Sequence, residues 1–250
     1  MDAFSGTTIA LARRCRRSIS ATHAVGVPHD HFSGGTVKLN SLSFMDGEAM
    51  PDRYALRRNA GPTTLVPAEN LNPHLAWNDV PDGTASFVLL CADLDAPTDK
   101  SGINKPGVTF DDDSERALFY HWVVADLPAS VRDVDEGAYT PLHGEGASTS
   151  IPASAGQVGH NDYAGMPGME DAAGHCYGGP APPWNDRRPH RYRFTVYALS
   201  VPSLGLPDGF KAADVLQAMK DAVLAESSLT AVYTLNTSLS ATQVGSPSVS

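Results

Sequence analysis

Two aspartates and two histidines accompany the longest apolar stretches of this sequence, and their side chains could act together. Carboxylate and imidazole groups in one pocket can serve as a general acid and base, hold a metal ion, or bind an anion when the imidazole is protonated. We expect these four residues to wall one small polar pocket on a mainly β domain: Asp93, Asp95, His121 and His190.

The spacing of the polar residues places several of them on common faces. Asp93 and Asp95 follow a nearly continuous apolar run, and residues at i and i+2 of an extended chain point to the same side. His190 and Tyr192 have the same spacing at the start of another apolar run. Pro97 fixes the backbone after the two aspartates and should end the first strand. Each feature alone is also typical of a turn or of a core residue, so only the combination indicates a site.

A rigid segment precedes the second histidine. Its sequence over 177–183 is Tyr-Gly-Gly-Pro-Ala-Pro-Pro. Glycine lets a backbone approach a ligand closely, and proline holds that approach in place. We expect Gly179 and Pro183 to contact the ligand, with the backbone N–H groups of Gly178 and Gly179 as donors.

Apolar runs and alternation predict the elements that position these residues. The chain has 22 Gly and 19 Pro, which favour short strands joined by turns. Apolar residues at three- and four-residue spacing predict one helix over 211–225, while the Pro- and Asn-rich segment 62–77 should be irregular. The pattern predicts a mainly β, sandwich-like domain. The expected strands cover 37–44, 85–92, 119–127, 191–201 and 228–235.

Composition narrows the classes of partner. The 250 residues suffice for one domain with a sizeable core. The formal net charge is −10, from 18 Lys and Arg against 28 Asp and Glu, which argues against a nucleic-acid-binding surface. The longest apolar run is too short to span a bilayer, and the three cysteines indicate neither a disulfide framework nor a zinc knuckle. We expect a soluble, cytoplasmic protein.

The first 35 residues differ from the rest of the chain. They lack sustained periodicity and include four arginines between residues 13 and 17. The polar sequence that follows Arg17 lacks the apolar stretch of a secretory signal. We therefore expect a disordered extension over 1–35 and one domain over 36–250, with a periplasmic or organelle-targeting leader as the alternative.

Three motifs occur together and in order: D-x-D-A-P from Asp93, H-W at His121, and G-G-P-x-P-P over 178–183 followed by H-R-Y-x-F-x-V-Y-A-L from His190. Together they resemble the phosphatidylethanolamine-binding protein family, also called the Raf kinase inhibitor-like family, and residues 72–83 are similar to its bacterial branch. The resemblance covers residues 37–240. It implies a β-sandwich of two antiparallel sheets with Greek-key connections, and a C-terminal helix near the mouth of the pocket.

The resemblance also implies a ligand and a set of pocket residues. Family members bind phosphate-like anions, including phospholipid head groups, so we expect a small-anion-binding protein without a cofactor. A ligand-modulated regulatory or inhibitory role and a homodimer are further expectations, and no protein partner is identified. Two inserts depart from the family pattern and flank the pocket, over 98–116 and 159–175. The implied ligand-binding residues are Asp93, Asp95, Pro97, His121, Pro183, His190 and Tyr192.

Carboxylates in an anion site require an explanation. We hypothesise that one of the two aspartates accepts a hydrogen bond from a ring nitrogen of His121 or His190. This would favour the imidazolium and leave its other N–H to face the ligand. Tyr192 would add a hydroxyl donor. Phosphate binding should then weaken as the pH rises from about 6 to 8.

Two alternatives use the same groups. Asp and His together could promote hydrolysis, or two carboxylates and two imidazoles could coordinate a metal ion. The chain has no Ser or Cys in an activating motif and none of the short His and Asp spacings of a dedicated metal motif. A binding protein is therefore the preferred hypothesis over an enzyme or a metalloprotein.

Overall fold

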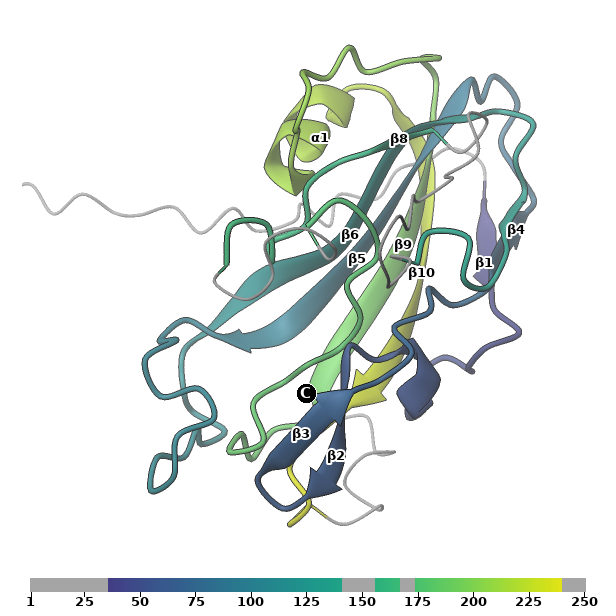
Figure 1. The fold of residues 1–250 in the computed structure, drawn as a ribbon. Helices are drawn as coiled ribbons and strands as arrows, with labels where there is room; N and C mark the ends of the chain where they lie inside the picture. The colour runs from purple at the N-terminus through teal and green to yellow at the C-terminus, as the bar shows by residue number, and fades with distance from the viewer. Residues whose placement is uncertain (1–35, 141–155, 167–173, 240–250) are drawn as a thin grey trace, which may run out of the picture. The chain divides into compact units, whose positions relative to one another are not determined.

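A computed structural model describes residues 36–140, 156–166 and 174–239, and its largest element is a five-stranded antiparallel sheet. The strand order is β10-β9-β5-β6-β8, and Figure 1 shows the four long strands side by side. The central strand β5 is long and almost wholly buried, as expected of a strand covered on both faces. The bounds are β5 Ser86–Pro97, β6 Arg116–Pro128, β8 Gln157–Val158, β9 His190–Leu199 and β10 Val223–Tyr233.

A smaller sheet packs against one face of this large sheet. Its strand order is β1-β4-β7, and a separate hairpin pairs β2 with β3. The core between the two sheets includes Trp77, whose ring centroid lies 5.3 Å from that of Phe87. Mainly-β architecture with antiparallel sheets is therefore confirmed. The bounds are β1 Lys38–Asn40, β2 Arg57–Gly61, β3 Thr64–Pro67, β4 Leu75–Asn78 and β7 Asp133–Val134, with a 3-10 helix η1 at Asp52–Tyr54.

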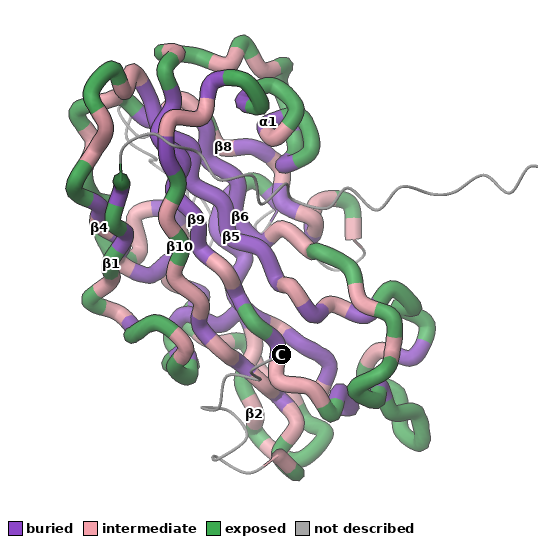
Figure 2. Tube along the Cα trace, turned by 180° about the vertical axis from the view of Figure 1, so that it is seen from behind, coloured by how far each residue is buried: buried purple, intermediate pink, exposed green. Residues whose placement is uncertain are grey.

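The opposite face of the large sheet is covered by the helix α1 (Ala212–Met219). Val215 and Met219 of this helix join Val88 and Val123 of the sheet in a second buried cluster. The middle parts of β5, β6 and β9 are therefore buried on both faces of the sheet, and Figure 2 shows these central stretches mostly in purple. None of the helices in the described part of the chain is long and apolar enough to cross a membrane.

Several predicted elements have the wrong bounds. The helix ends at Met219 rather than continuing to residue 225, because Val223 begins a strand that pairs with Leu199 of β9. Backbone pairing in the sheet therefore overrides the helical spacing of the apolar residues. The segment 62–77 is not irregular throughout, since it contains β3 and most of β4. The predicted extension over 1–35 lies outside the described residues.

Strand pairing brings distant parts of the sequence to one end of the large sheet. Asp93 of β5 lies opposite Tyr192 of β9 on one side and Phe119 of β6 on the other. A register irregularity follows in β5, between Asp93 and Ala96. Such irregularities re-aim side chains near functional sites. The polar ends of three strands thus meet at one place.

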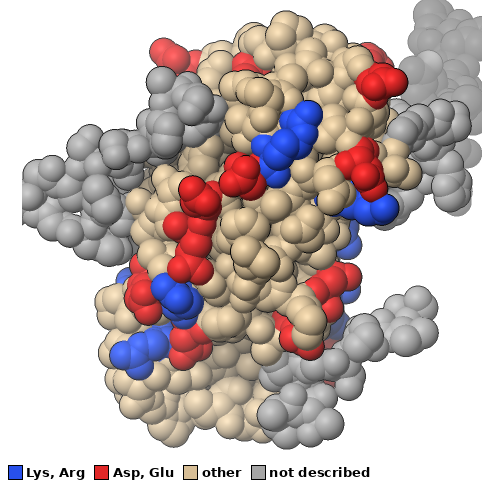
Figure 3. All heavy atoms as spheres, turned by 90° about the vertical axis from the view of Figure 1, so that its right-hand side faces the viewer, with Lys and Arg blue, Asp and Glu red and all other residues tan. Residues whose placement is uncertain are grey.

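Some of the charges on the surface form ion pairs. Arg53 lies 2.9 Å from Glu136, and Lys38 lies 2.6 Å from Asp79. On the face shown in Figure 3, Lys and Arg lie beside Asp and Glu rather than forming a large patch of one sign.

Candidate functional site

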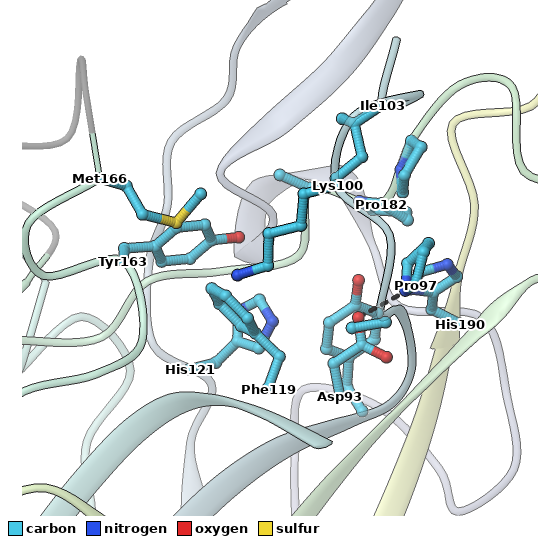
Figure 4. Close-up of a pocket in the computed structure, with 14 residues that line it drawn as sticks. Asp93, Pro97, Lys100, Ile103, Phe119, His121, Tyr163, Met166, Pro182 and His190 are labelled. Carbon is cyan, nitrogen blue, oxygen red and sulfur yellow. Dashed lines mark hydrogen bonds and ion pairs between the residues drawn. The ribbon is translucent and has the colours of Figure 1, made fainter. Parts of the chain in front are cut away.

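A small pocket lies at the end of the large sheet where the three strands meet (Figure 4). Its volume is about 130 Å³, well below the roughly 300–1,000 Å³ typical of pockets for drug-sized ligands. Its buried residues with polar groups are Asp93, His121, Tyr163, His190 and Tyr192. The remaining wall is largely apolar and includes Ala96, Pro97, Phe119, Met166, Pro182 and Pro183.

His190 is held between two carboxylates. Its Nδ1 lies 2.7 Å from Oδ2 of Asp93, and its Nε2 lies 3.0 Å from Oδ2 of Asp186. Burial opposes the charged form, but the Asp93 charge and the hydrogen bonds of both carboxylates outweigh it and raise the pKa of His190 to about 9. The predicted hydrogen bond between an aspartate and a histidine is confirmed. The prediction that the second N–H faces the ligand is wrong for His190, because Asp186 accepts it.

The other carboxylates near the pocket also have cationic partners. Asp186 accepts hydrogen bonds from two guanidinium nitrogens of Arg116, at 2.5 and 3.1 Å. Asp95 accepts from Nε and Nη2 of Arg191, at 2.9 and 3.0 Å, and from the Arg191 backbone N–H. Burial works against ionisation of Asp95, but the Arg191 hydrogen bonds outweigh it and lower the pKa. Each of these carboxylates is thus neutralised locally.

The structure does not place Asp95 in the pocket lining. After the register irregularity in β5, its carboxylate pairs with Arg191, while its backbone N–H donates to Oδ1 of Asp93 at 2.8 Å. Simple alternation along a strand therefore gives the wrong surroundings for Asp95. The residue supports Asp93 rather than lining the cavity.

His121 has a different environment from His190. Its Nδ1 lies 2.6 Å from the carbonyl oxygen of Gly178, so Nδ1 carries the proton and Nε2 is bare in the neutral ring. Burial lowers the pKa of His121, although the nearby Asp93 charge acts in the opposite direction. The rings of Phe119, Tyr163 and Tyr192 surround it, with centroids 5.1, 5.2 and 5.1 Å away. His121 is therefore a neutral imidazole in an aromatic cage at neutral pH.

The Tyr192 hydroxyl is fully buried and makes no hydrogen bond of good geometry with the described residues, although Asp93 lies close enough to interact with it. Its ring stacks on His190 with a centroid distance of 6.5 Å, so the two residues share a face as their spacing predicts. Burial raises the pKa of Tyr192 well above its usual value, and both the charge of Asp93 and its interaction with the hydroxyl act in the same direction. The phenol therefore keeps its proton and can donate it in a hydrogen bond.

The glycines of the 177–183 segment serve packing rather than ligand contact. The Gly178 N–H donates to the carbonyl of His121 at 3.0 Å, and the Gly179 N–H donates to Oδ1 of Asn70 at 2.7 Å. A Cβ at Gly179 would lie 2.2 Å from the carbonyl oxygen of Tyr54. The prediction that these two N–H groups are free donors is wrong, and Gly179 is absent from the lining. Pro183 does line the pocket.

Loop residues complete the lining. Lys100 and Ile103 come from the insert between β5 and β6, and Tyr163 and Met166 from the second insert. Sequence reasoning missed all four individually, although it placed both inserts beside the pocket. Residues 167–173 of the second insert lie outside the described part of the chain.

Two further expectations concern the helix and metal binding. No residue of α1 lines the pocket, because the helix packs against Val88 and Val123 on the other face of the sheet. The expected position of the helix at the pocket mouth is therefore wrong. Among the described residues, no group of three or more His, Cys, Asp or Glu side chains is placed to hold a metal ion.

Comparison with known proteins adds to this geometry. The model of the family described as "Phosphatidylethanolamine-binding protein" matches residues 40–234. The chain belongs to the phosphatidylethanolamine-binding protein family. It is 33% identical over 201 residues to a UPF0098 protein of Aquifex aeolicus, covering 80% of this chain and 90% of that protein. It is also 32% identical to UPF0098 protein YbhB of Escherichia coli, covering 79% of this chain and 99% of that protein.

Solved structures of the family share the fold. The crystal structure of Escherichia coli YbcL, described as a member of the mammalian PEBP family, superposes with a TM-score of 0.58 and 25% identity, covering 79% of this chain and 98% of YbcL. A Chlamydia trachomatis PEBP homologue superposes with a TM-score of 0.53 and 25% identity, covering 79% of this chain and 97% of that chain. Membership in the family, predicted from the three motifs, and in its bacterial branch, predicted from residues 72–83, is confirmed.

Proposed function

We propose that the pocket binds a small phosphate-like anion, as a free ion or as a phospholipid head group. The observation that carries this proposal is the Tyr192 hydroxyl, which is buried in the pocket wall and makes no hydrogen bond of good geometry with the described residues. Leaving a buried hydroxyl unpaired costs about 1–3 kcal/mol. A ligand oxygen that accepts this hydrogen bond accounts for its presence.

The electrostatics of the pocket support an anionic ligand. Asp93 is the carboxylate in the lining, and the protonated His190 neutralises it. A ligand anion therefore meets no net negative charge from this pair. Burial lowers the pKa of His121 and so disfavours the imidazolium. A bound anion would offset this effect, so that Nε2 of His121 can take up a proton.

The size of the pocket favours a head group over a whole lipid. A cavity of about 130 Å³ accepts a phosphate group and a few further atoms but not an acyl chain. The surrounding aromatic and proline residues form a rigid apolar wall. In the regulatory role that we propose, ligand occupancy changes the adjacent inserts and through them contact with a partner.

The alternative functions receive less support. The thiols of Cys91 and Cys176 are buried, and burial raises the pKa of Cys91 well above its usual value and that of Cys176 to about 12. Neither thiol is in the reactive thiolate form at neutral pH. Both nitrogens of His190 are engaged with carboxylates, so this histidine has no free nitrogen for base catalysis.

Titration calorimetry with inorganic phosphate tests the proposal. We expect saturable binding of one phosphate per chain, competed by other small phosphate compounds. Sodium chloride at matched ionic strength controls for general screening. Absence of saturable binding at millimolar phosphate would overturn the proposal.

A further inference from the structure

Lys100 is a cation in the pocket wall that forms no ion pair with any carboxylate in the described part of the chain. We propose that Lys100 binds the ligand's negative charge and makes the pocket selective for phosphate monoesters and free phosphate over zwitterionic phosphodiesters such as an ethanolamine head group. This inference rests on the proposed function and deepens it by naming the ligand class.

The side chain of Lys100 is directed at the aromatic cage around His121. Its Nζ lies 5.2 Å from the centroid of the Phe119 ring, and Figure 4 shows it between Phe119 and Tyr163, above His121. An exposed cation–π contact contributes only about 0.5–1 kcal/mol. A phosphate oxygen, which offers a full negative charge, is a better partner for the ammonium than the ring.

The loop that carries Lys100 is anchored to the protein. Asn185, which is buried, donates through Nδ2 to the carbonyl oxygens of Gly102 and Val108, at 2.9 and 3.0 Å. Its Oδ1 accepts the N–H of Asn104 at 3.0 Å. Gly102 packs so closely that a Cβ would lie 2.8 Å from Val108 and 3.1 Å from Phe110. These contacts fix the backbone of the loop directly after Lys100.

The other cations near the site already have partners. His190 lies between Asp93 and Asp186, and Arg191 is paired with Asp95. Lys100 is thus the residue in the described lining whose positive charge is not offset by a hydrogen-bonded carboxylate. Its charge is available to a ligand.

This distribution of charge discriminates between two ligand classes. A phosphate monoester carries about −1.5 to −2 at pH 7, so it can use both Lys100 and a protonated His121. An ethanolamine phosphodiester carries one negative charge and one ammonium. The ammonium gains nothing from Asp93, whose Oδ2 is hydrogen-bonded to His190, and is repelled by Lys100.

Calorimetry with three probes tests the inference: inorganic phosphate, glycerol 3-phosphate and glycerophosphoethanolamine. We expect wild-type protein to bind the first two about tenfold or more tightly than the diester, as for a charge-assisted hydrogen bond. Lys100→Met should weaken phosphate binding by about tenfold or more and narrow the difference between monoester and diester. Lys100→Arg should retain the preference.

Lys105→Met is the matched control, because Lys105 is an exposed lysine of the same loop that does not line the pocket. Its affinities should equal those of wild type. Equal phosphate affinity in wild type and Lys100→Met, or diester binding as tight as monoester binding, would overturn this inference and leave the proposed function standing. If wild type binds none of the three probes, both proposals fail.

Discussion

Asp93 and His190 form an ion pair in the wall of the pocket, with 2.7 Å between Oδ2 and Nδ1 and both side chains at most 5% exposed. Asp186 accepts the remaining N–H of the same ring. His190 thus neutralises the carboxylate in the pocket. Other residues must supply the positive charge and the hydrogen bonds that bind an anion.

Protein stability should depend on pH through His190. Its folded-state pKa of about 9 exceeds the usual unfolded value of about 6.5, so the folded protein binds the extra proton between these values. This contribution is fully present below about pH 6.5 and disappears as the pH rises through about 9, a loss on the order of 3 kcal/mol. Urea unfolding at successive pH values measures it. In Asp186→Asn the folded-state pKa of His190 should be lower, so the loss should be smaller and complete at a lower pH; a free energy of unfolding that stays constant across this range would contradict the assignment.

Removing the Tyr192 hydroxyl should separate binding from stability. Tyr192→Phe deletes a buried donor that makes no hydrogen bond of good geometry with the described residues, so phosphate affinity should fall about tenfold while the free energy of unfolding stays the same or rises by about 1 kcal/mol. Calorimetry and urea unfolding give the two readouts. Tyr197→Phe on the same strand is the control, because Tyr197 belongs to the cluster under α1. Unchanged phosphate binding in Tyr192→Phe would remove the main support for the anion site.

Asn185 should affect binding from outside the pocket. Asn185→Leu leaves four backbone groups of the Lys100 loop without this partner, lowering the free energy of unfolding by about 1–3 kcal/mol and weakening phosphate binding severalfold. Asn72→Leu is matched to it, since Asn72 is a buried asparagine that anchors a different loop through Asp135 and Tyr139. It should destabilise the protein without changing affinity. Equal loss of affinity in both variants would indicate a general effect of destabilisation.

Phosphate affinity should fall as the pH rises from about 6 to 8. The lowered pKa leaves His121 neutral with a bare Nε2, so a bound anion requires a proton on the ring or on the phosphate itself. Both protons become scarcer with rising pH, by up to about tenfold per pH unit. Sulfate, which keeps a fixed charge over this range, isolates the contribution of His121. An affinity independent of pH for both anions would show that no proton is taken up.

Much of the fold could be predicted because its determinants are local. Continuous apolar runs identified β5, β6 and β9, since strands buried on both faces require such runs. The end of the helix could not be predicted, because Val223 is drawn into a strand by its pairing with Leu199. Short strands such as β3 and β4 have too few residues to establish a periodic pattern.

The polar part of the site was predictable where the chemical groups lie on a strand. Asp93, His121, His190 and Tyr192 lie on β5, β6 and β9, and the structure brings all four to one pocket. Lys100 lies on a loop whose position is fixed by Asn185, some 80 residues away in the sequence, and no local pattern encodes that contact. Phe119 could have been predicted to line the pocket, because it lies two residues before His121 on the same strand and therefore points to the same side.

The central claim is that an anion binds beside His121, and NMR of the histidine ring nitrogens tests it most directly. Long-range ¹H–¹⁵N spectra should show His190 protonated on both nitrogens near pH 7, and His121 protonated on Nδ1 alone. Adding phosphate should shift the Nε2 resonance of His121 toward the protonated or hydrogen-bonded range while His190 stays unchanged. A His121 spectrum that is the same with and without saturating phosphate would contradict the account.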